Sequence, residues 1–473
     1  MQGALEVRPV RAAGAWQGAS LAAVHLGLAL AGFVALGVAQ LFAFTQMGAL
    51  TDHSSGLRSF ALAVFAGSFL VFTVVSLLRH GLLMTLAWIG ASRAERRRFA
   101  PMESWPTVSV LVPAYNEAGR IEKALDSILA LDYPQLEAIV VDDGSKDDTF
   151  ARVSRYAGRH GGKSIRVLRK ENGGKWSALN LAFHQAAGEL IVCVDADSHL
   201  APQSLKLLAR HFADASVGAC AGQVRVRNQV NLATRFQALE YLLMNGIARQ
   251  AQSALGTVMV APGPLSMFRK SVLSQAWKRW GRPQSLPLAQ PPARVYGPWE
   301  DDTFAEDADL TLCVLLGGNS VVYEPRAVSH TAAPEWTFPL LNQRYRWTRG
   351  SLQAALKAWR RLPDAPSAPR SLAFWLASLI FETIAWPAVN LYGLLAFLLV
   401  LGVFGLQGPL LLWFLALTVI DLNAAAFSAR LEDGDMRLLA LTPLSRVYFN
   451  LVLDVSKFFA LYDELRGKRM SWS

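Results

Sequence analysis

Charged residues are scarce in this 473-residue chain, and cysteine is scarcer still. Charged side chains occupy 17% of positions, against about 25% in average soluble domains. The deficit excludes an ordinary soluble protein, because hydrophobic residues reach 52% and gather in long runs. The three cysteines form no C-x-x-C pair, which argues against a disulfide framework and fits a reducing compartment. The eight histidines include no H-E-x-x-H spacing, so a zinc site is not expected.

Nucleic acid is the first partner that a net charge of +10 suggests. However, the basic residues cluster beside apolar runs, at Arg93–Arg98 and again at Lys357–Arg361. This is the positive-inside pattern of segments that flank membrane helices on the cytoplasmic side. We therefore expect the lipid bilayer as a partner, and no nucleic acid.

Long apolar segments lie at both ends of the chain. About 20 helical residues cross a 30 Å hydrocarbon core. Ser20–Phe44 contains no charged side chain, and a second apolar run covers Ser59–Gly90. Near the other end, Ser371–Phe404 carries one charge, and Pro387 predicts a kink between a short interfacial helix and a spanning helix. A further span is predicted from about Gln407 to Ile420, with an extension to Phe427 as the alternative.

The first apolar run has an alternative interpretation as a signal peptide, with Gly37-Val38-Ala39 as the cleavage site. The run is longer than the core of a usual signal peptide and a second run follows it, so we expect a retained anchor. Either interpretation leaves the next segment in the cytoplasm.

The last segment predicts an amphipathic helix. Its polar residues recur at helical spacing on one face, with Leu and Phe on the others. These polar residues are Arg446, Asn450, Asp454 and Lys457. If this helix crossed the membrane, the basic tail Arg466–Arg469 would lie outside, against the charge rule. We therefore expect it to lie at the membrane interface.

Between the membrane segments the pattern is that of an α/β domain, with apolar strand-like runs alternating with helical ones. Four runs predict buried parallel strands: Val108–Val112, Ala138–Val141, Ile165–Leu168 and Leu190–Val194. Ligands bind beyond the carboxyl ends of such strands. The chain thus divides into an N-terminal membrane region (1–100), a cytoplasmic domain (101–370) and a C-terminal membrane region (371–473).

Polar motifs follow these predicted strands. Pro113–Glu117, which contains Tyr115, follows the first strand, and Asp142 closes the second beside a Gly turn. Carboxylates at strand ends suit the hydrogen-bond donors of a nucleoside, although such turns are also common capping loops. A third strand ends in Asp195-Ala196-Asp197. Carboxylates with this spacing can hold Mg²⁺ or Mn²⁺ against a diphosphate, and a capped turn is the alternative.

The ordered set resembles the processive family-2 glycosyltransferases, which synthesise poly-N-acetylglucosamine, hyaluronan, chitin and cellulose. The resemblance covers Pro106 to Lys357 and extends more loosely to the membrane segments. Its most specific parts are Phe304–Leu310 and Gln343–Trp347, which look like the T-E-D and Q-x-x-R-W motifs. Ala305 replaces the usual Thr. The implied fold is a GT-A-type, Rossmann-like nucleotide-sugar domain flanked by transmembrane helices.

The resemblance implies how the donor is bound. Asp142 would contact the uridine. Asp197, helped by Asp195, would hold Mg²⁺ or Mn²⁺ together with the diphosphate. Lys175 and Asn180 match a further donor-site segment of the family.

The resemblance also implies the reacting groups. Asp307, beside Glu306, would be the general base that takes the proton of the acceptor hydroxyl. In the Q-x-x-R-W motif, which begins at Gln343, Arg346 would clamp the diphosphate and Trp347 would stack against the acceptor sugar. The alternatives are a buried ion pair between Asp307 and Arg346 and an apolar anchor at Trp347.

Two other segments belong to this comparison. Gly263–Arg269 resembles the loop that cradles the acceptor end in hyaluronan and chitin synthases, and an ordinary turn is the alternative. The Pro-rich insertion Ala276–Arg294 is not required by the family pattern, and its composition favours disorder.

These observations predict an enzyme of the bacterial inner membrane that transfers sugar from a UDP-sugar to a growing β-linked polysaccharide and exports the chain. N-acetylglucosamine is the favoured unit and glucose the second choice. The partners are the donor, the polysaccharide, the bilayer and, as a candidate, a small membrane or periplasmic export protein. Two alternatives stay open: a non-processive transferase that adds one sugar to a membrane lipid, and a non-catalytic scaffold or sugar-nucleotide sensor.

Overall fold

A computed structural model of the chain describes residues 56–98, 104–281, 292–404 and 408–468, together with residues 23, 24, 27 and 102. The first predicted span, Ser20–Phe44, lies almost entirely outside the described residues. The same is true of residues 282–291, which form the centre of the Pro-rich insertion. The later predicted spans and all of the sequence motifs lie wholly or largely within the described ranges.

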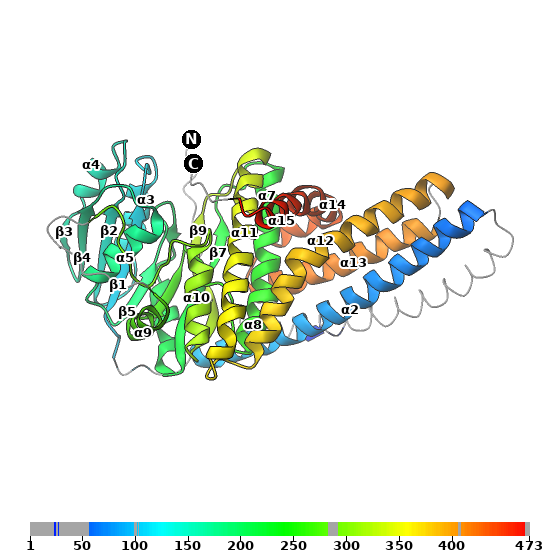
Figure 1. Cartoon of the computed structure of the whole chain (residues 1–473). Helices are drawn as coiled ribbons and strands as arrows, with labels where there is room; N and C mark the ends of the chain where they lie inside the picture. Colours follow the sequence, from blue (N-terminus) through cyan, green and yellow to red (C-terminus); the bar gives the residue numbers. More distant parts are fainter. Residues whose placement is uncertain are drawn as a thin grey trace.

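A nine-stranded mixed sheet forms the centre of the described structure (Figure 1). The strands are β1 (Val108–Ala114), β2 (Leu136–Asp142), β3 (Gly158–His160), β4 (Lys163–Arg169), β5 (Leu190–Cys193), β6 (His199–Leu200), β7 (Val217–Val226), β8 (Ser266–Arg269) and β9 (Ser320–Thr331). Their order is β3-β4-β2-β1-β5-β8-β7-β9-β6. The parallel pairing of β1 with β2 and β5, and of β2 with β4, confirms the four predicted strands. Strand β8 pairs antiparallel to β5 and β7, which the sequence did not predict.

Both faces of the parallel strands are buried because alternate apolar residues pack under helices on either side. On β1, Leu111 packs with helix α5 (Lys175–Gln185) and α10 (Glu306–Leu316). Its neighbours Val110 and Val112 pack on the opposite face with α3 (Ile121–Leu129) and α6 (Ser204–Arg210). Two short or peripheral helices, α4 (Thr149–Ser154) and α9 (Lys270–Trp280), complete this part. The layered packing leaves the carboxyl ends of β1, β2 and β5 as one open edge.

Three long helices run side by side away from the sheet (Figure 1): α2 (Gly56–Arg98), α12 (Ser371–Phe404) and α13 (Gly408–Leu431). An ion pair of 3.1 Å between Arg79 and Glu382 joins α2 to α12. Among the described residues, one stretch is long and apolar enough to cross a membrane, at Ser371–Leu399 within α12. The prediction of two helices here was wrong: α12 continues through Pro387 as one helix, since a proline removes a single backbone donor and need not end a helix.

The chain then returns to the sheet through η4 (Met436–Leu441), α14 (Thr442–Tyr448), the π-helical turn η5 (Phe449–Asp454) and α15 (Val455–Leu465). Helix α15 packs against α11 (Thr337–Arg361), where the Tyr345 hydroxyl donates to Asp463 at 2.6 Å. Asp454 accepts hydrogen bonds from Lys457 and from Asn390 of α12. The segment therefore lies along the base of the long helices.

Glu432, the residue after α13, is buried and ties this region to the sheet. Its Oε2 accepts hydrogen bonds from the Tyr323 hydroxyl (2.5 Å) and from Gln223 Nε2 (2.7 Å), and its Oε1 accepts one from Gln250 Nε2 (3.2 Å). Burial raises the pKa of Glu432 to about 7, and the hydrogen bonds only partly oppose this. The end of α13 is thus held by a carboxyl group that titrates near neutral pH.

Replacing Glu432 with Gln should change how stability depends on pH. The pKa of Glu432 is about 7 in the folded protein and 4.5 as its ordinary value, so the folded state binds more protons between these values. Its contribution to stability therefore increases as pH falls from about 8 to about 5, by on the order of 2 kcal/mol. We expect Glu432→Gln to remove this part of the pH dependence of the melting temperature. Glu171→Gln, at an exposed carboxylate, is the control, and equal pH dependence in all three proteins would contradict the assignment.

Candidate active site

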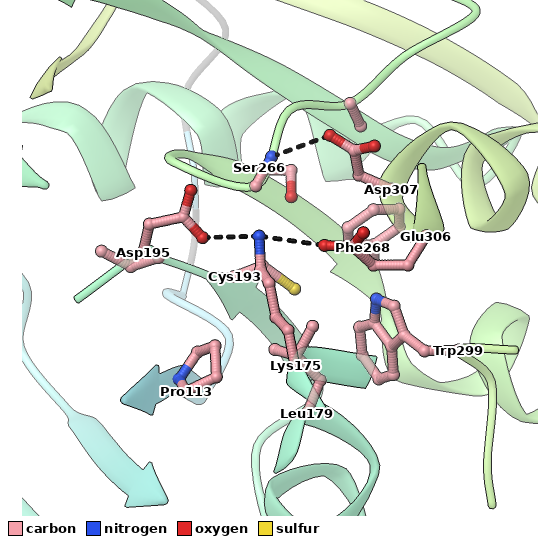
Figure 2. Close-up of a pocket in the computed structure, with 13 residues that line it drawn as sticks. Pro113, Lys175, Leu179, Cys193, Asp195, Ser266, Phe268, Trp299, Glu306 and Asp307 are labelled. Carbon is pink, nitrogen blue, oxygen red and sulfur yellow. Dashed lines mark hydrogen bonds and ion pairs between the residues drawn. The ribbon is translucent and has the colours of Figure 1, made fainter. Parts of the chain in front are cut away.

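A pocket opens at the carboxyl ends of β1 and β5, between the N-terminal ends of α5 and α10 (Figure 2). Its polar lining residues are Lys175, Asp195, Ser266, Glu306 and Asp307. Pro113, Cys193 and Trp299 lie among its apolar walls. The pocket is therefore at the sheet edge where the sequence predicted the ligand, and it brings together Lys175, Asp195, Glu306 and Asp307 from three separate motifs.

Lys175 lies at the centre of this pocket. Its Nζ is 2.8 Å from Asp195 Oδ1 and 2.9 Å from Glu306 Oε1 (Figure 2). It is the first residue of α5, and the preceding Gly174 has a φ of +93°, which favours glycine. Burial alone would lower the pKa of Lys175, but the neighbouring carboxylates raise it well above its ordinary value. The pocket thus holds a permanent positive charge between two acidic groups.

Asp307 lies in the first turn of α10 and is held by backbone donors. The Gly263 N–H donates to its Oδ2 at 3.3 Å, and the Ala308 N–H donates to its Oδ1 at 2.8 Å. Gly263 approaches so closely that an added Cβ would lie 2.7 Å from Lys175 Nζ. Burial, and then the charge of Glu306, raise the pKa of Asp307 to about 6. This carboxylate is poised to accept a proton near neutral pH.

A second cluster of carboxylates lies around Asp197, which follows β5. Burial, and then the charge of Asp195, raise the pKa of Asp197. Burial, and then the charge of Asp197, raise the pKa of Glu117. Three carboxylates from two loops thus repel one another at one place. Their oxygens are the ligands that Mg²⁺ and Mn²⁺ prefer, and a divalent cation would relieve this repulsion. In donor type these carboxylates suit such an ion, although their ligand atoms do not all lie within 4.8 Å of one another.

Asp142 ends β2 at the same sheet edge and is fully buried. Its Oδ2 is 3.1 Å from Arg169 Nε, and the Ser145 N–H donates to its Oδ1 at 3.4 Å. Tyr115, on the neighbouring loop, is exposed, and Asn116 beside it has a φ of +55°. These residues flank the pocket on the side of β2, as a separate subsite would.

Comparison with known proteins shows the family to which the chain belongs. The sequence pattern described as Glycosyl transferase family 2 matches residues 109–277. An N-acetylglucosaminyltransferase of Mesorhizobium japonicum is 32% identical over 334 residues, which cover 69% of this chain and 74% of that protein. The chain belongs to glycosyl transferase family 2. This glycosyltransferase also shares 29% identity over 279 residues with a poly-β-1,6-N-acetyl-D-glucosamine synthase of Staphylococcus epidermidis, covering 59% of this chain and 61% of that protein.

Two further matches show how much of a relative's length the chain covers and which fold it shares. An N-acetylglucosaminyltransferase of a Rhizobium species is 34% identical over 264 residues, and 56% of its length is covered. Across these three relatives the covered share runs from 56% to 74%. A solved mannosyltransferase of Pyrobaculum calidifontis, in complex with GDP-Man and Mn²⁺, has a TM-score of 0.57 and 24% identity, covering 87% of this chain and all of that one. The glycosyltransferase thus has a mixed α/β fold of the GT-A type around its nine-stranded sheet.

Asn180 was predicted to bind the donor, but the structure gives it a supporting position. Its Nδ2 donates to the Val295 and Trp299 carbonyl oxygens at 2.9 and 2.8 Å, and its Oδ1 accepts from the Trp299 N–H. Both amide hydrogens are used, and the side chain is fully buried. Asn180 therefore fixes the loop that carries Trp299 into the pocket wall.

The Q-x-x-R-W motif lies on α11, outside the lining of the pocket. Trp347 is exposed, and the Arg344 guanidinium stacks over its ring at 4.4 Å. Arg344 was not predicted as a site residue; it also pairs with Glu240 at 2.7 Å. Within the described part of the chain, Arg346 is exposed and no hydrogen bond or ion pair joins it to Asp307 or to another residue. The alternative of a buried Asp307–Arg346 pair is therefore not observed.

Gln343 was predicted as a site residue, whereas Asp143 was not. Gln343 Oε1 is buried without a hydrogen-bond partner among the described residues. Asp143, which the sequence motif contained but the prediction passed over, binds Lys170 at 2.6 Å and accepts from the Gly173 and Gly174 N–H groups. This contact holds the loop that leads into Lys175. In the sequence, Asp143 could have been found as the second acidic residue of Asp142-Asp143-Gly144.

An acidic cluster of Glu300, Asp302 and Asp309 has the spacing of a metal site. Lys357 fills it, with Nζ 2.5, 2.8 and 2.8 Å from the three carboxylates. Lys357, which the sequence analysis counted in the basic segment before α12, is thus engaged with carboxylates of the α/β domain. Lys357 gives this cluster a cationic partner, as Lys175 gives one to Asp195 at 2.8 Å.

Proposed function

We propose that this glycosyltransferase moves N-acetylglucosamine from UDP-N-acetylglucosamine to the growing end of a β-linked polysaccharide, with inversion at the anomeric carbon, and exports the chain. The observation that carries the proposal is the half-buried Asp307, with its raised pKa, in a pocket that also holds Lys175. The choice of sugar is supported by the printed names of the relatives, which transfer N-acetylglucosamine or polymerise it.

The residues of the pocket suit one inverting displacement. Asp307 would take the proton of the acceptor hydroxyl while that oxygen attacks the anomeric carbon. The bond from this carbon to the diphosphate breaks on the opposite face, and its electron pair leaves with UDP. Attack opposite to an α-linked nucleotide yields a β bond. Lys175 and the exposed Arg346 supply the positive charge that the departing diphosphate requires.

We infer that Mg²⁺ or Mn²⁺ takes part. Asp197, Asp195 and Glu117 would hold the ion, for which their mutual repulsion is the supporting observation. When bound, the ion would neutralise charge on the diphosphate of the leaving nucleotide. On the side of β2, Asp142 and Tyr115 would bind the uridine.

We also propose a multi-pass protein of the bacterial inner membrane, with the α/β domain in the cytoplasm and membrane regions at 1–100 and 371–473. Support comes from the parallel course of α2, α12 and α13 away from the sheet (Figure 1) and from the apolar stretch Ser371–Leu399. Trp347 faces outward on α11 at the base of these helices. An aromatic ring there could hold the sugar at the chain end, and the helices would supply its exit path.

The product distribution tests the proposal. Purified enzyme in lipid, with limiting acceptor and excess UDP-N-acetylglucosamine, should give long β-linked chains beside unextended acceptor, as measured by mass spectrometry. Trp347→Ala should shorten these chains, while Trp359→Ala, at another exposed tryptophan of α11, should leave them unchanged. If every acceptor gains one sugar before any gains a second, the enzyme is a non-processive transferase. Absence of UDP release with any UDP-sugar would instead indicate a scaffold or sensor.

A further inference from the structure

Four large apolar side chains are exposed together where two loops lead into helices α7 (Leu232–Leu243) and α11. Their exposed fractions are 67% for Val230, 60% for Leu232, 74% for Trp336 and 79% for Phe338. Single exposed apolar residues are common, but four on adjoining loops mark a contact surface. We call these four residues the Trp336 patch. None of them lines the active-site pocket.

The loops that carry the Trp336 patch are fastened to each other. Asn228 Nδ2 donates to the Ala333 carbonyl at 2.8 Å, and the Ala333 N–H donates back to Asn228 Oδ1 at 2.7 Å. Asn231 Nδ2 donates to the Glu335 carbonyl at 3.0 Å. Gln237 Nε2, from α7, donates to the Pro334 carbonyl at 2.8 Å. The apolar side chains are therefore presented outward by a fixed framework, and no rearrangement is needed for a partner to cover them.

The position of the Trp336 patch indicates what covers it. Helices α7 and α11 lie beside α14 and α15, at the base of the long helices (Figure 1). Phe236, one turn into α7, stacks on Tyr448 of α14 with ring centroids 4.5 Å apart. The neighbouring helices expose apolar residues of their own, among them Leu444 on α14 and Phe459 and Leu465 on α15. The patch thus lies at the N-terminal ends of two helices that pack against α14 and α15, which also carry exposed apolar residues.

We propose that the Trp336 patch inserts into the boundary between headgroups and acyl chains of the cytoplasmic leaflet. A tryptophan ring with its polar N–H suits this layer, and aromatic side chains gather there in membrane proteins. Arg235, exposed one turn after Leu232, places positive charge beside the patch, where anionic headgroups would meet it. The contact would fix α11, and with it Trp347, at the membrane surface. The proposal rests on the membrane insertion proposed above, and it is independent of which sugar is transferred.

Spin labels can test the contact in the full-length protein. The three native cysteines are buried, so single cysteines introduced as Trp336→Cys, Phe338→Cys or Val230→Cys can be labelled selectively. The protein is reconstituted into bilayers of phosphatidylethanolamine and phosphatidylglycerol, and label relaxation by oxygen and by a polar nickel chelate is compared. Leu398→Cys, exposed on α12, is the lipid control, and Arg159→Cys, exposed on β3, is the water control.

We expect the ratio of oxygen to nickel accessibility at the patch to approach that at Leu398 and to exceed that at Arg159 on the order of ten-fold, because hydrocarbon excludes a polar chelate and admits oxygen. Nickel accessibility equal to that at Arg159 would overturn the proposal. So would shielding from both reagents, which would indicate a protein partner. Release of UDP by a variant shows that it is folded. If Trp336→Cys does not fold, Val230→Cys, on the other loop, tests the lipid contact in its place. Lipid exposure without polymer synthesis would uphold this contact and refute the proposed function.

Discussion

Asp307→Asn should lower turnover by about 10²-fold or more, the scale on which a general base contributes, while UDP-sugar affinity changes only a few-fold. Asparagine keeps the size of the side chain and an oxygen that can accept the Gly263 N–H. It cannot take a proton from the acceptor hydroxyl. The two backbone N–H groups donate to different oxygens of Asp307, so asparagine keeps the hydrogen bond from Gly263 and loses the one from Ala308, at a cost of about 1 kcal/mol that should not unfold the pocket.

The pH profile adds a second measurement of the same carboxylate. Because the pKa of Asp307 is raised to about 6, the base is protonated below that pH. For the unmodified enzyme, kcat/KM should fall about ten-fold per pH unit below about 6, whereas Asp307→Asn should lack this limb. Asp309→Asn is the matched control on the same helix, since Asp309 pairs with Lys357; it should reduce stability and leave the limb. If Asp307→Asn loses binding but keeps turnover at saturation, Asp307 binds substrate instead.

The strands and the strand-end acids could be predicted because both are encoded locally. An apolar run such as Val108–Val112 predicts a buried strand by itself, and Asp142 and Asp195 lie at or just after the ends of strands on either side of β1. Strand β8 could not be predicted in the same way. It is a short strand that pairs antiparallel between β5 and β7, and a local pattern does not reveal a partner more than forty residues away in sequence, as the pairing of Ala221 with Ser266 shows.

For individual side chains too, the sequence could not reveal partners that lie far away along the chain. Lys357 was interpreted from its basic neighbours, yet its partner Glu300 lies 57 residues earlier. Glu432 carried no motif at all, and its hydrogen bond to Tyr323 spans 109 residues. For the site, the resemblance to the family implied that Lys175, Asp195 and Asp307 belong together. It did not predict that Lys175 would bridge Asp195 and Glu306, or that Asn180 would hold a loop.

Removal of the divalent cation, or of the Asp197 carboxylate, should have an effect of similar size. Asp197, Asp195 and Glu117 repel one another, and Lys175 Nζ is within ion-pair distance of only one of the three. The leaving diphosphate would add further negative charge at this place. A metal ion contributes several kcal/mol of charge stabilisation to such a step, so EDTA should lower activity by on the order of 10²- to 10³-fold.

Added Mg²⁺ or Mn²⁺ should restore the unmodified enzyme and should not restore Asp197→Ala, which removes a ligand outright. Binding of Mn²⁺ itself, followed by its electron paramagnetic resonance, gives a readout that does not depend on turnover. Asp302→Asn supplies the matched control, because Asp302 belongs to the other acidic cluster, where Lys357 Nζ already lies 2.8 Å from it. We expect that variant to bind Mn²⁺ as the unmodified enzyme does. Loss of Mn²⁺ binding in Asp302→Asn but not in Asp197→Ala would move the metal to the cluster around Lys357, and full activity of Asp197→Ala in EDTA would remove the metal from the reaction.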